Sequence, residues 1–362
     1  MPPRMARVGL AMAGLLLACA EPPATERSGP LLPAPDGPET IGSAIFEWVD
    51  SSRAEPATED TADRRLLRAQ LWYPADRSAG GDYTPLFPEL AAYRAADPEA
   101  FPPSLAQLGT HSLADAAIRS DGGPFPVVLF FHGWNSQRSA YTGLLETLAS
   151  HGFVAVGLDQ PFAGRIVMPD GTVTPSRDDQ FGSAEAMLAA YSADGLFALD
   201  RLRALDAAGR FRGRLDLSRV ATVGHSNGAV SAVVLAQRDE RIVAVALLDS
   251  FGQDVEPIFR VSQPLLLLRT GGASAPSAGY LDGTGNELFD VTIPGGAHLT
   301  ASDWPWIRAP DDSSRAAALA PSLALRRTLV AFLDRALKGN ATQVPQQSDL
   351  ASGAARLETH RP

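Results

Sequence analysis

The sequence predicts an α/β protein with a central sheet that is mostly parallel and carries helices on both faces. Two observations lead to this prediction. From Phe125 onward, short runs that are apolar throughout alternate with segments of helical spacing. Several of these runs end in Gly or Asp, which favour turns. Strands that are apolar on both faces are typical of a parallel sheet covered by helices.

The expected strands and helices follow one another along the chain. Two upstream segments, "IGSAIFEWVDS" and "LLRAQLWYP", are expected to start the sheet as antiparallel strands. The later strands are expected at "FPVVLFFHG", "FVAVGLD", "RVATVGH", "IVAVALLD", "PLLLLRTG" and "ELFDVTIPG". Helices are expected at "SAYTGLLETLASHG", which ends in a Gly stop signal, at "SAEAMLAAYSADGLFALDRLRAL" and at "SLALRRTLVAFLDRALKG".

One domain, residues 41–338, is expected to hold all of these elements. A chain of 362 residues that is 45% hydrophobic can bury one large core, and no internal repeat is visible. Residues 78–118 are rich in Pro and Ala with little periodicity, so they are expected to form an irregular excursion over the sheet. Residues 339–362 are expected to be a polar tail.

Residues 1–19 are expected to be an export signal and lipobox that lie outside the fold. Two arginines precede the apolar run "VGLAMAGLLLACA", which is too short to span a bilayer. Its end, "LLAC", resembles a bacterial lipobox, so Cys19 is the expected lipidation site of a cell-envelope lipoprotein. The Pro-rich residues 20–40 would then be a flexible tether to the membrane. The alternatives are cleavage after Ala20, which would release a secreted protein, or an ordinary signal residue at Cys19.

Charge and composition argue against several other classes. The formal net charge is −10 and no basic run occurs, so nucleic acid is not expected as a partner. The histidines are scattered, the single cysteine lies in the signal, and neither H-E-x-x-H nor an acidic calcium loop occurs, so no metal is expected. No phosphate-binding Gly loop follows the first strand of the parallel part, so no nucleotide cofactor is expected either.

The stretch "RVATVGHSNGAVSAVV" places Ser226 between a buried strand and a helix. The pattern G-x-S-x-G at such a turn is typical of the nucleophile elbow of α/β-hydrolases. Gly224 and Gly228 are expected to be needed because neighbouring backbone passes close to this tight turn. Ser226 would then stand at the carboxyl edge of the sheet, where open α/β folds bind ligands. The alternative is a helix N-cap serine flanked by glycines.

A serine nucleophile needs a histidine base, and the six histidines allow a choice by elimination. His298 lies downstream of the serine, in the Gly-rich loop "IPGGAHLTASDW" after the last strand, so we expect it to be the base. The alternative is a solvated loop histidine. The others lie in the tail, inside the elbow, at a strand end, at a helix end and in the excursion, namely His360, His225, His132, His151 and His111.

The third member of the site should be a carboxylate that orients the base. Asp249 ends the strand "IVAVALLD", 23 residues after Ser226. The next strand, "PLLLLRTGG", ends without an acid, which favours Asp249. A strand-end Asp that caps a turn is the alternative role, and Asp254 and Asp282 are the alternative acids.

Backbone amides should hold the charge that develops on the substrate oxygen. By position, the donors are Asn227, directly after the nucleophile, and Trp134, in the loop after "VVLFFHG". Alternatively, the bulky side chain of Trp134 forms a wall of a pocket or part of the core. Three other aromatic residues, Phe162, Trp304 and Trp306, are candidates for the wall of an apolar acyl site, with core or rim as the alternative.

From about Ile41 to Lys338, these segments resemble the plasma-type (group VII) platelet-activating factor acetylhydrolase family. The resemblance rests on "QLWYPAD", "GPFPVVLFFHGW", "LASHGFVAVGLD", "VATVGHSNG", "ALLD", "QPLLLLRTGG" and "IPGGAHLTASDW". The early acid is its most specific feature, and it differs from cutinase-like polyester hydrolases. By position the resemblance implies the nucleophile Ser226, the acid Asp249, the base His298 and the oxyanion donors Trp134 and Asn227.

The resemblance implies a calcium-independent serine esterase that hydrolyses short or oxidised acyl chains at the sn-2 position of phospholipids. The chain departs from the family beside the acyl pocket, because Ala229 stands for a second elbow glycine and Asn227 for an aromatic residue. We therefore expect a carboxylic ester hydrolase that acts through an acyl-enzyme on a small-molecule or lipid ester. The alternatives are a cutinase-like polyester hydrolase, acyl transfer to an alcohol, and a non-catalytic surface lipoprotein that binds lipid.

Overall fold

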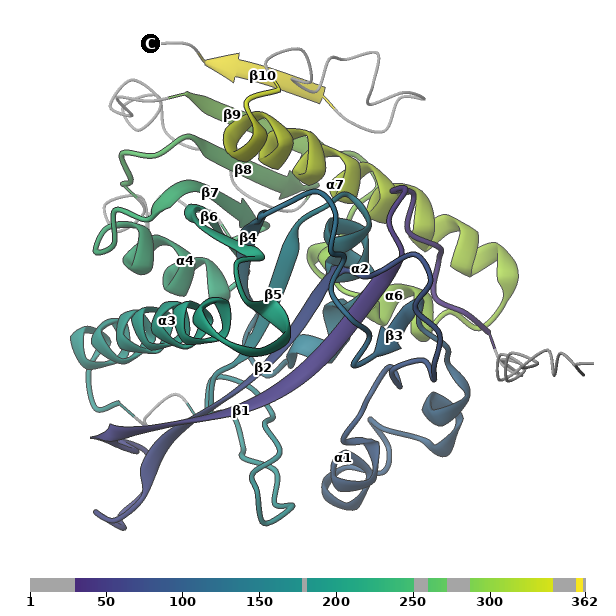
Figure 1. The fold of residues 1–362 in the computed structure, drawn as a ribbon. Helices are drawn as coiled ribbons and strands as arrows, with labels where there is room; N and C mark the ends of the chain where they lie inside the picture. The colour runs from purple at the N-terminus through teal and green to yellow at the C-terminus, as the bar shows by residue number, and fades with distance from the viewer. Residues whose placement is uncertain (1–29, 178–180, 251–259, 272–286, 341–355, 361–362) are drawn as a thin grey trace, which may run out of the picture.

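The computed structural model describes residues 30–177, 181–250, 260–271, 287–340 and the backbone of 356–360 (Figure 1). Its strands are β1 (Ile41–Ala54), β2 (Arg64–Pro74), β3 (Ser112–Ala114), β4 (Phe125–Phe131), β5 (Val154–Asp159), β6 (Leu215–His225), β7 (Ile242–Leu248), β8 (Leu265–Thr270), β9 (Leu288–Ile293) and β10 (Arg356–His360). The helices are α1 (Leu90–Ala96), α2 (Thr142–Ser150), α3 (Ala184–Ala207), α4 (Gly228–Ala236), α6 (Trp304–Ile307) and α7 (Asp312–Lys338).

The described strands form one ten-stranded sheet in the order β10-β9-β8-β7-β6-β4-β5-β2-β1-β3. Neighbouring strands are parallel from β5 through β4, β6, β7 and β8 to β9. The pairs β1–β2, β2–β5 and β9–β10 are antiparallel. This topology confirms the predicted mostly parallel sheet and its antiparallel start.

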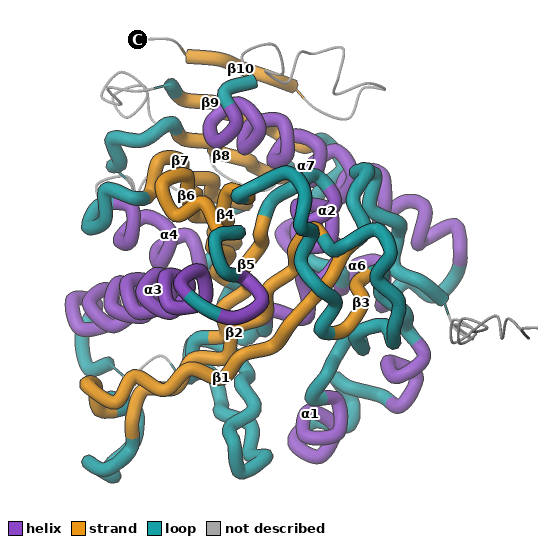
Figure 2. Tube along the Cα trace, viewed as in Figure 1, coloured by secondary structure: helices purple, strands orange, loops and turns teal. Residues whose placement is uncertain are grey.

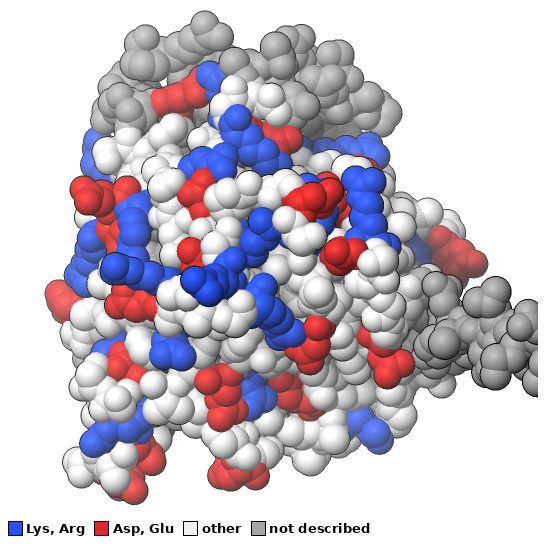
Figure 3. All heavy atoms as spheres, viewed as in Figure 1, with Lys and Arg blue, Asp and Glu red and all other residues white. Residues whose placement is uncertain are grey.

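Helices cover both faces of the sheet, as Figures 1 and 2 show. On one face, α2 and α7 pack with alternate residues of β4 such as Val128 and Phe130. On the other face, α3 and α4 pack with Val127 and Leu129 of the same strand. Because successive side chains of a strand point to opposite faces, these continuous apolar strands fill two cores at once. Acidic and basic side chains are interspersed over the face seen in Figure 3.

Helix α7 begins earlier than its sequence pattern predicts. The expected helix started after Pro321, but α7 starts at Asp312, where the side chain of Asp311 accepts a hydrogen bond of 2.8 Å from the Ser314 amide. By length and composition alone, α7 could cross a membrane. One side of α7, including Leu329 and Leu333, is buried in the core against the sheet, whereas Ala316 and Ala317 near its start are exposed.

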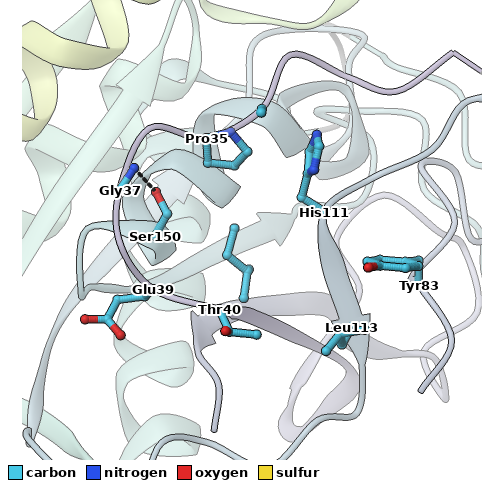
Figure 4. Close-up of a pocket in the computed structure, with 10 residues that line it drawn as sticks. Pro35, Gly37, Glu39, Thr40, Tyr83, His111, Leu113 and Ser150 are labelled. Atoms are coloured by element: carbon cyan, nitrogen blue, oxygen red, sulfur yellow. Dashed lines mark hydrogen bonds between the residues drawn. The ribbon is translucent and has the colours of Figure 1, made fainter. Parts of the chain in front are cut away.

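The tether predicted for residues 20–40 is wrong for residues 30–40, which pack onto the body. Leu32 is 1% exposed, and the Gly37 amide donates to Ser150 Oγ at 3.2 Å. A Cβ at Gly37 would lie 2.2 Å from the Ser150 carbonyl oxygen, so the chain fits closely against the end of α2. Figure 4 shows this contact at the rim of a small pocket that the segment forms beside β3. Residues 1–29, with Cys19, lie outside the described residues.

The expected excursion, residues 78–118, contains α1, a 3-10 turn and β3, which pairs in parallel with the start of β1. Phe87, Tyr93 and Phe101 in this segment are buried, and the Tyr93 and Phe101 rings stack with their centroids 4.8 Å apart. The sequence predicts a polar tail at residues 339–362. Within them, the backbone of residues 356–360 forms β10, which pairs with β9. Among the described strands, β10 thereby covers the side of β9 that no other strand pairs with.

Candidate active site

Ser226 lies in the turn between β6 and α4, at the carboxyl edge of the sheet. Its φ is 52°, a left-handed conformation that is uncommon for residues other than glycine. Its backbone amide donates to the Leu248 carbonyl oxygen at 3.0 Å, which ties the turn to the end of the neighbouring strand β7. Strain of this kind persists where the surrounding structure fixes the backbone, and it is concentrated at functional sites.

The two glycines of the turn are required by close backbone approach, as the sequence predicts. A Cβ at Gly224 would lie 2.3 Å from the Gly228 carbonyl oxygen. A Cβ at Gly228 would lie 2.3 Å from the carbonyl oxygen of Phe131, at the end of β4. Real Cβ atoms do not approach backbone this closely, so any larger residue would push α4 away from the sheet.

The structure brings together the three side chains that the sequence singled out. The His298 Nε2 lies 2.9 Å from Ser226 Oγ, and its Nδ1 lies 2.7 Å from Asp249 Oδ2. The His298 side chain is 54% exposed, whereas that of Asp249 is 7% exposed. With Nδ1 donating to the carboxylate, Nε2 is free to accept the serine proton, and the carboxylate would stabilise the resulting imidazolium.

A residue that the sequence analysis missed, Thr270, holds the carboxylate of Asp249. The Thr270 backbone amide and hydroxyl each donate to Asp249 Oδ1 at 2.7 Å. Burial would raise the pKa of Asp249, but the hydrogen bonds from Thr270 and His298 hold it below its ordinary value, so the group is ionised at neutral pH. Thr270 ends β8, and Asp249 directly follows the neighbouring parallel strand β7. The expected pairing of these two strands could therefore have placed Thr270 beside Asp249. The alternative acids Asp254 and Asp282 lie outside the described residues.

The loop after β4 lies directly against the serine. A Cβ at Gly133 would be 3.2 Å from the Ser226 Cβ. The Gly133 amide donates to the Tyr141 hydroxyl at 3.2 Å. In the described part of the chain, the amides of Trp134 and Asn227 donate to no other protein group, which leaves both available to a substrate oxygen. The Trp134 side chain is 36% exposed, so it belongs to the surface of the site and not to the core.

The loop after β5 holds the Trp134 loop from its other side. The Asn135 amide donates to the Ala163 carbonyl oxygen at 3.0 Å, and the Arg165 amide donates to the Ser136 carbonyl oxygen at 3.1 Å. A Cβ at Gly164 would lie 2.2 Å from that same Ser136 oxygen. Gly164 therefore sets how closely the two loops approach, a role for which the sequence offered no signal.

Two of the three aromatic residues considered for an acyl pocket, Trp304 and Trp306, make other contacts. Trp304 is 8% exposed and stacks on Phe87, with centroids 5.5 Å apart, so its contacts are those of the core. Trp306 is half-buried, and its ring lies 5.2 Å from the Arg315 guanidinium carbon. Phe162 is buried with a φ of 65° in the loop after β5. Among the described residues, no group of three or more His, Cys, Asp or Glu side chains could hold a metal ion.

Comparisons with known proteins agree with this architecture. A family model described as platelet-activating factor acetylhydrolase, isoform II, matches residues 59–160, and one described as chlorophyllase matches residues 115–251. A probable 1-alkyl-2-acetylglycerophosphocholine esterase of Arthroderma benhamiae is 28% identical over 164 residues, 38% of each chain. The platelet-activating factor acetylhydrolase of Cavia porcellus is 25% identical over 179 residues, 41% of each chain. The chain thus spans about two fifths of the length of these curated relatives.

A solved structure extends the likeness to nearly the whole chain. The ferulic acid esterase from Streptomyces cinnamoneus superimposes with a TM-score of 0.70 and 25% identity, covering 91% of this chain and 99% of that one. Its match confirms the α/β-hydrolase fold that the elbow and the strand order indicate. With the fold, the elbow and the family-model matches taken together, the chain has the α/β-hydrolase fold and is similar to platelet-activating factor acetylhydrolases.

Proposed function

We propose that the protein is a serine carboxylic ester hydrolase that works through an acyl-enzyme. One observation carries the proposal: a continuous chain of hydrogen bonds runs from Asp249 through His298 to Ser226 at the carboxyl edge of the sheet. The names of the curated relatives and of the solved esterase support the same reaction class.

The reaction would proceed in two matched halves. His298 Nε2 takes the proton of Ser226 while Oγ attacks the ester carbonyl, and the amides of Trp134 and Asn227 stabilise the oxyanion. The C–O bond to the alcohol then breaks as His298 returns the proton to the leaving oxygen. Water gives a proton to the same nitrogen as it attacks the acyl carbon. The bond between this carbon and Ser226 Oγ then breaks, and His298 returns the proton to Oγ, which releases the acid and restores Ser226. Throughout, ionised Asp249 offsets the charge of the imidazolium.

We further propose short-acyl esters as substrates, including phospholipids with a short or oxidised sn-2 chain. The curated relatives support this class by their names, since both names refer to esterases of 1-alkyl-2-acetyl phospholipids or platelet-activating factor. A second candidate is an aromatic acyl ester, because the structural neighbour that covers 91% of this chain is a ferulic acid esterase. Export and lipidation at Cys19 remain part of the proposal, supported by the "LLAC" motif; labelled palmitate incorporation that is lost in Cys19→Ser would test it.

One comparison of substrates tests the proposal. Protein lacking residues 1–19 is assayed on sn-2 acetyl and sn-2 palmitoyl phosphatidylcholine, p-nitrophenyl butyrate and methyl ferulate, with Ser226→Ala as the blank. We expect cleavage of the acetyl phospholipid and the butyrate, and none of the palmitoyl phospholipid. Cleavage of methyl ferulate with neither phospholipid would select the aromatic class. Activity on a polyester film would favour the cutinase-like alternative, and a wild type equal to the blank would favour a non-catalytic lipid-binding protein.

A further inference from the structure

A second histidine, His225, is in direct contact with His298. His225 is the last residue of β6 and is 1% exposed. Its Nε2 lies 2.7 Å from the backbone carbonyl oxygen of His298, and its Nδ1 lies 2.8 Å from the hydroxyl of Tyr141. The rings of the two histidines are also in contact, with centroids 4.9 Å apart and planes tilted by 38°. His225 therefore contacts His298, the proposed base, in two ways: it binds the backbone carbonyl oxygen of His298 and it packs against the His298 ring.

The partners of His225 determine which of its nitrogens carries the proton. The carbonyl oxygen of His298 can only accept, so Nε2 must donate. Burial lowers the pKa of His225 to about 4, so the ring is neutral at pH 7 and Nδ1 accepts from the Tyr141 hydroxyl. That hydroxyl keeps its proton because burial raises the pKa of Tyr141 to about 12. A single tautomer thus satisfies both hydrogen bonds.

Tyr141 continues the chain of hydrogen bonds to the loop after β4. Its hydroxyl accepts from the Gly133 amide at 3.2 Å while it donates to His225. A Cβ at Gly133 would lie 3.0 Å from His225 Nδ1, so the loop passes directly over the ring. Because the Gly133 amide is already used, the following amide, that of Trp134, is the one left for an oxyanion. This series of hydrogen bonds therefore joins the oxyanion loop, which is the loop after β4 with Gly133 and Trp134, to the backbone of His298.

We propose that His225 and Tyr141 are positioning residues that hold the His298 backbone and the oxyanion loop in register with Ser226. The inference rests on the proposed ester hydrolysis, because it assigns both residues to that same site. The His298 side chain is largely open to solvent, so the bond to its carbonyl oxygen restrains it from the buried side. Misplacing a catalytic group by about 1 Å costs on the order of 100-fold in rate.

Two substitutions separate the two bonds of His225. In His225→Gln the side-chain amide nitrogen replaces Nε2 and still donates to His298, whereas His225→Asn replaces Nδ1 with an oxygen acceptor and loses the donor. We expect His225→Asn to lower kcat for p-nitrophenyl butyrate on the order of 10- to 100-fold at an unchanged KM, and His225→Gln to lose much less. Rates are expressed per site titrated with a fluorophosphonate, which corrects for misfolded protein. The change His151→Gln, at the partly exposed C-terminal end of α2, is the matched control. Equal kcat per titrated site in His225→Asn and wild type would overturn the proposal.

Two further measurements test the link itself. Tyr141→Phe should lower kcat in the wild type but add little in His225→Gln, which places no acceptor at the position of Nδ1 where the hydroxyl donates; fully additive losses would overturn the link. Nitrogen NMR of the ring should find His225 protonated at Nε2 and unprotonated at Nδ1 at pH 7, and the opposite tautomer would also overturn it. If the wild type fails to hydrolyse the ester, the proposed function fails, while the NMR result still tests the hydrogen-bond chain.

Discussion

Replacing Thr270 tests how the carboxylate of Asp249 is held. The amide and the hydroxyl of Thr270 each donate to Asp249 Oδ1 at 2.7 Å. Thr270→Val removes the hydroxyl but keeps the side-chain shape and the backbone donor. Thr270→Ser keeps the hydroxyl and loses one methyl group. The two variants therefore separate the hydrogen bond from packing.

The expected effect follows from the strength of one hydrogen bond to a charged group, about 1.5–3 kcal/mol. Since one pKa unit corresponds to about 1.4 kcal/mol, the loss should raise the pKa of Asp249 by about one to two units. Burial raises this pKa, and the bonds from Thr270 and His298 bring it below its ordinary value of 3.8. A carboxyl whose pKa is lowered by folding stabilises the protein above the unfolded pKa, and this contribution is lost as the pH falls through the folded pKa.

Urea unfolding at a series of pH values measures this contribution directly. At pH 7, Thr270→Val should be less stable than wild type by about 1.5–3 kcal/mol, and the difference should shrink below about pH 4. Its kcat should fall by about ten-fold or less, because the backbone donor and His298 still hold the carboxylate. A deficit that is undiminished at low pH, or a Thr270→Ser variant as unstable as Thr270→Val, would refute the reasoning.

Four other outcomes are expected. Gly228→Ala puts a Cβ 2.3 Å from the Phe131 carbonyl oxygen, so it should lose about 1–3 kcal/mol; an unchanged thermal midpoint would contradict this. Gly164→Ala puts a Cβ 2.2 Å from the Ser136 oxygen, so it should lower kcat for p-nitrophenyl butyrate with little change in KM. Asp249→Asn should lower kcat by about 10⁴-fold while circular dichroism stays unchanged. EDTA should leave the rate unchanged, because the proposed acyl-enzyme mechanism uses no metal ion; a loss reversed by a divalent cation would count against this.

The parts of the site that local sequence specifies could be predicted. The pattern Gly-x-Ser-x-Gly between an apolar strand and a helix defines one turn. Both of its glycines lie against backbone, Gly224 against the start of α4 and Gly228 against the end of β4. The proximity of Asp249 follows from the parallel strands, because β6 and β7 are neighbours and their carboxyl ends share one edge. His298 followed from elimination among six histidines.

The remaining contacts depend on tertiary packing that no local pattern encodes. Sequence position set His225 aside because it lies inside the elbow, yet the loop after β9 brings the His298 carbonyl oxygen within hydrogen-bond distance of its Nε2. Leu32 lies in a Pro-rich stretch whose composition predicts a tether, but its side chain is buried because it packs against apolar residues of the folded domain. Trp304 follows the base closely in sequence, but the excursion supplies aromatic rings that cover it.

The central claim is that Ser226 is the nucleophile, and trapping it is the most direct measurement. Wild type and Ser226→Ala are treated with a fluorophosphonate and analysed by intact-mass and peptide mass spectrometry, alongside p-nitrophenyl butyrate hydrolysis. The account predicts one adduct per chain on Ser226, loss of hydrolysis in proportion to labelling, and neither adduct nor hydrolysis in Ser226→Ala. Hydrolysis that persists in Ser226→Ala, or an adduct on another residue, would contradict it.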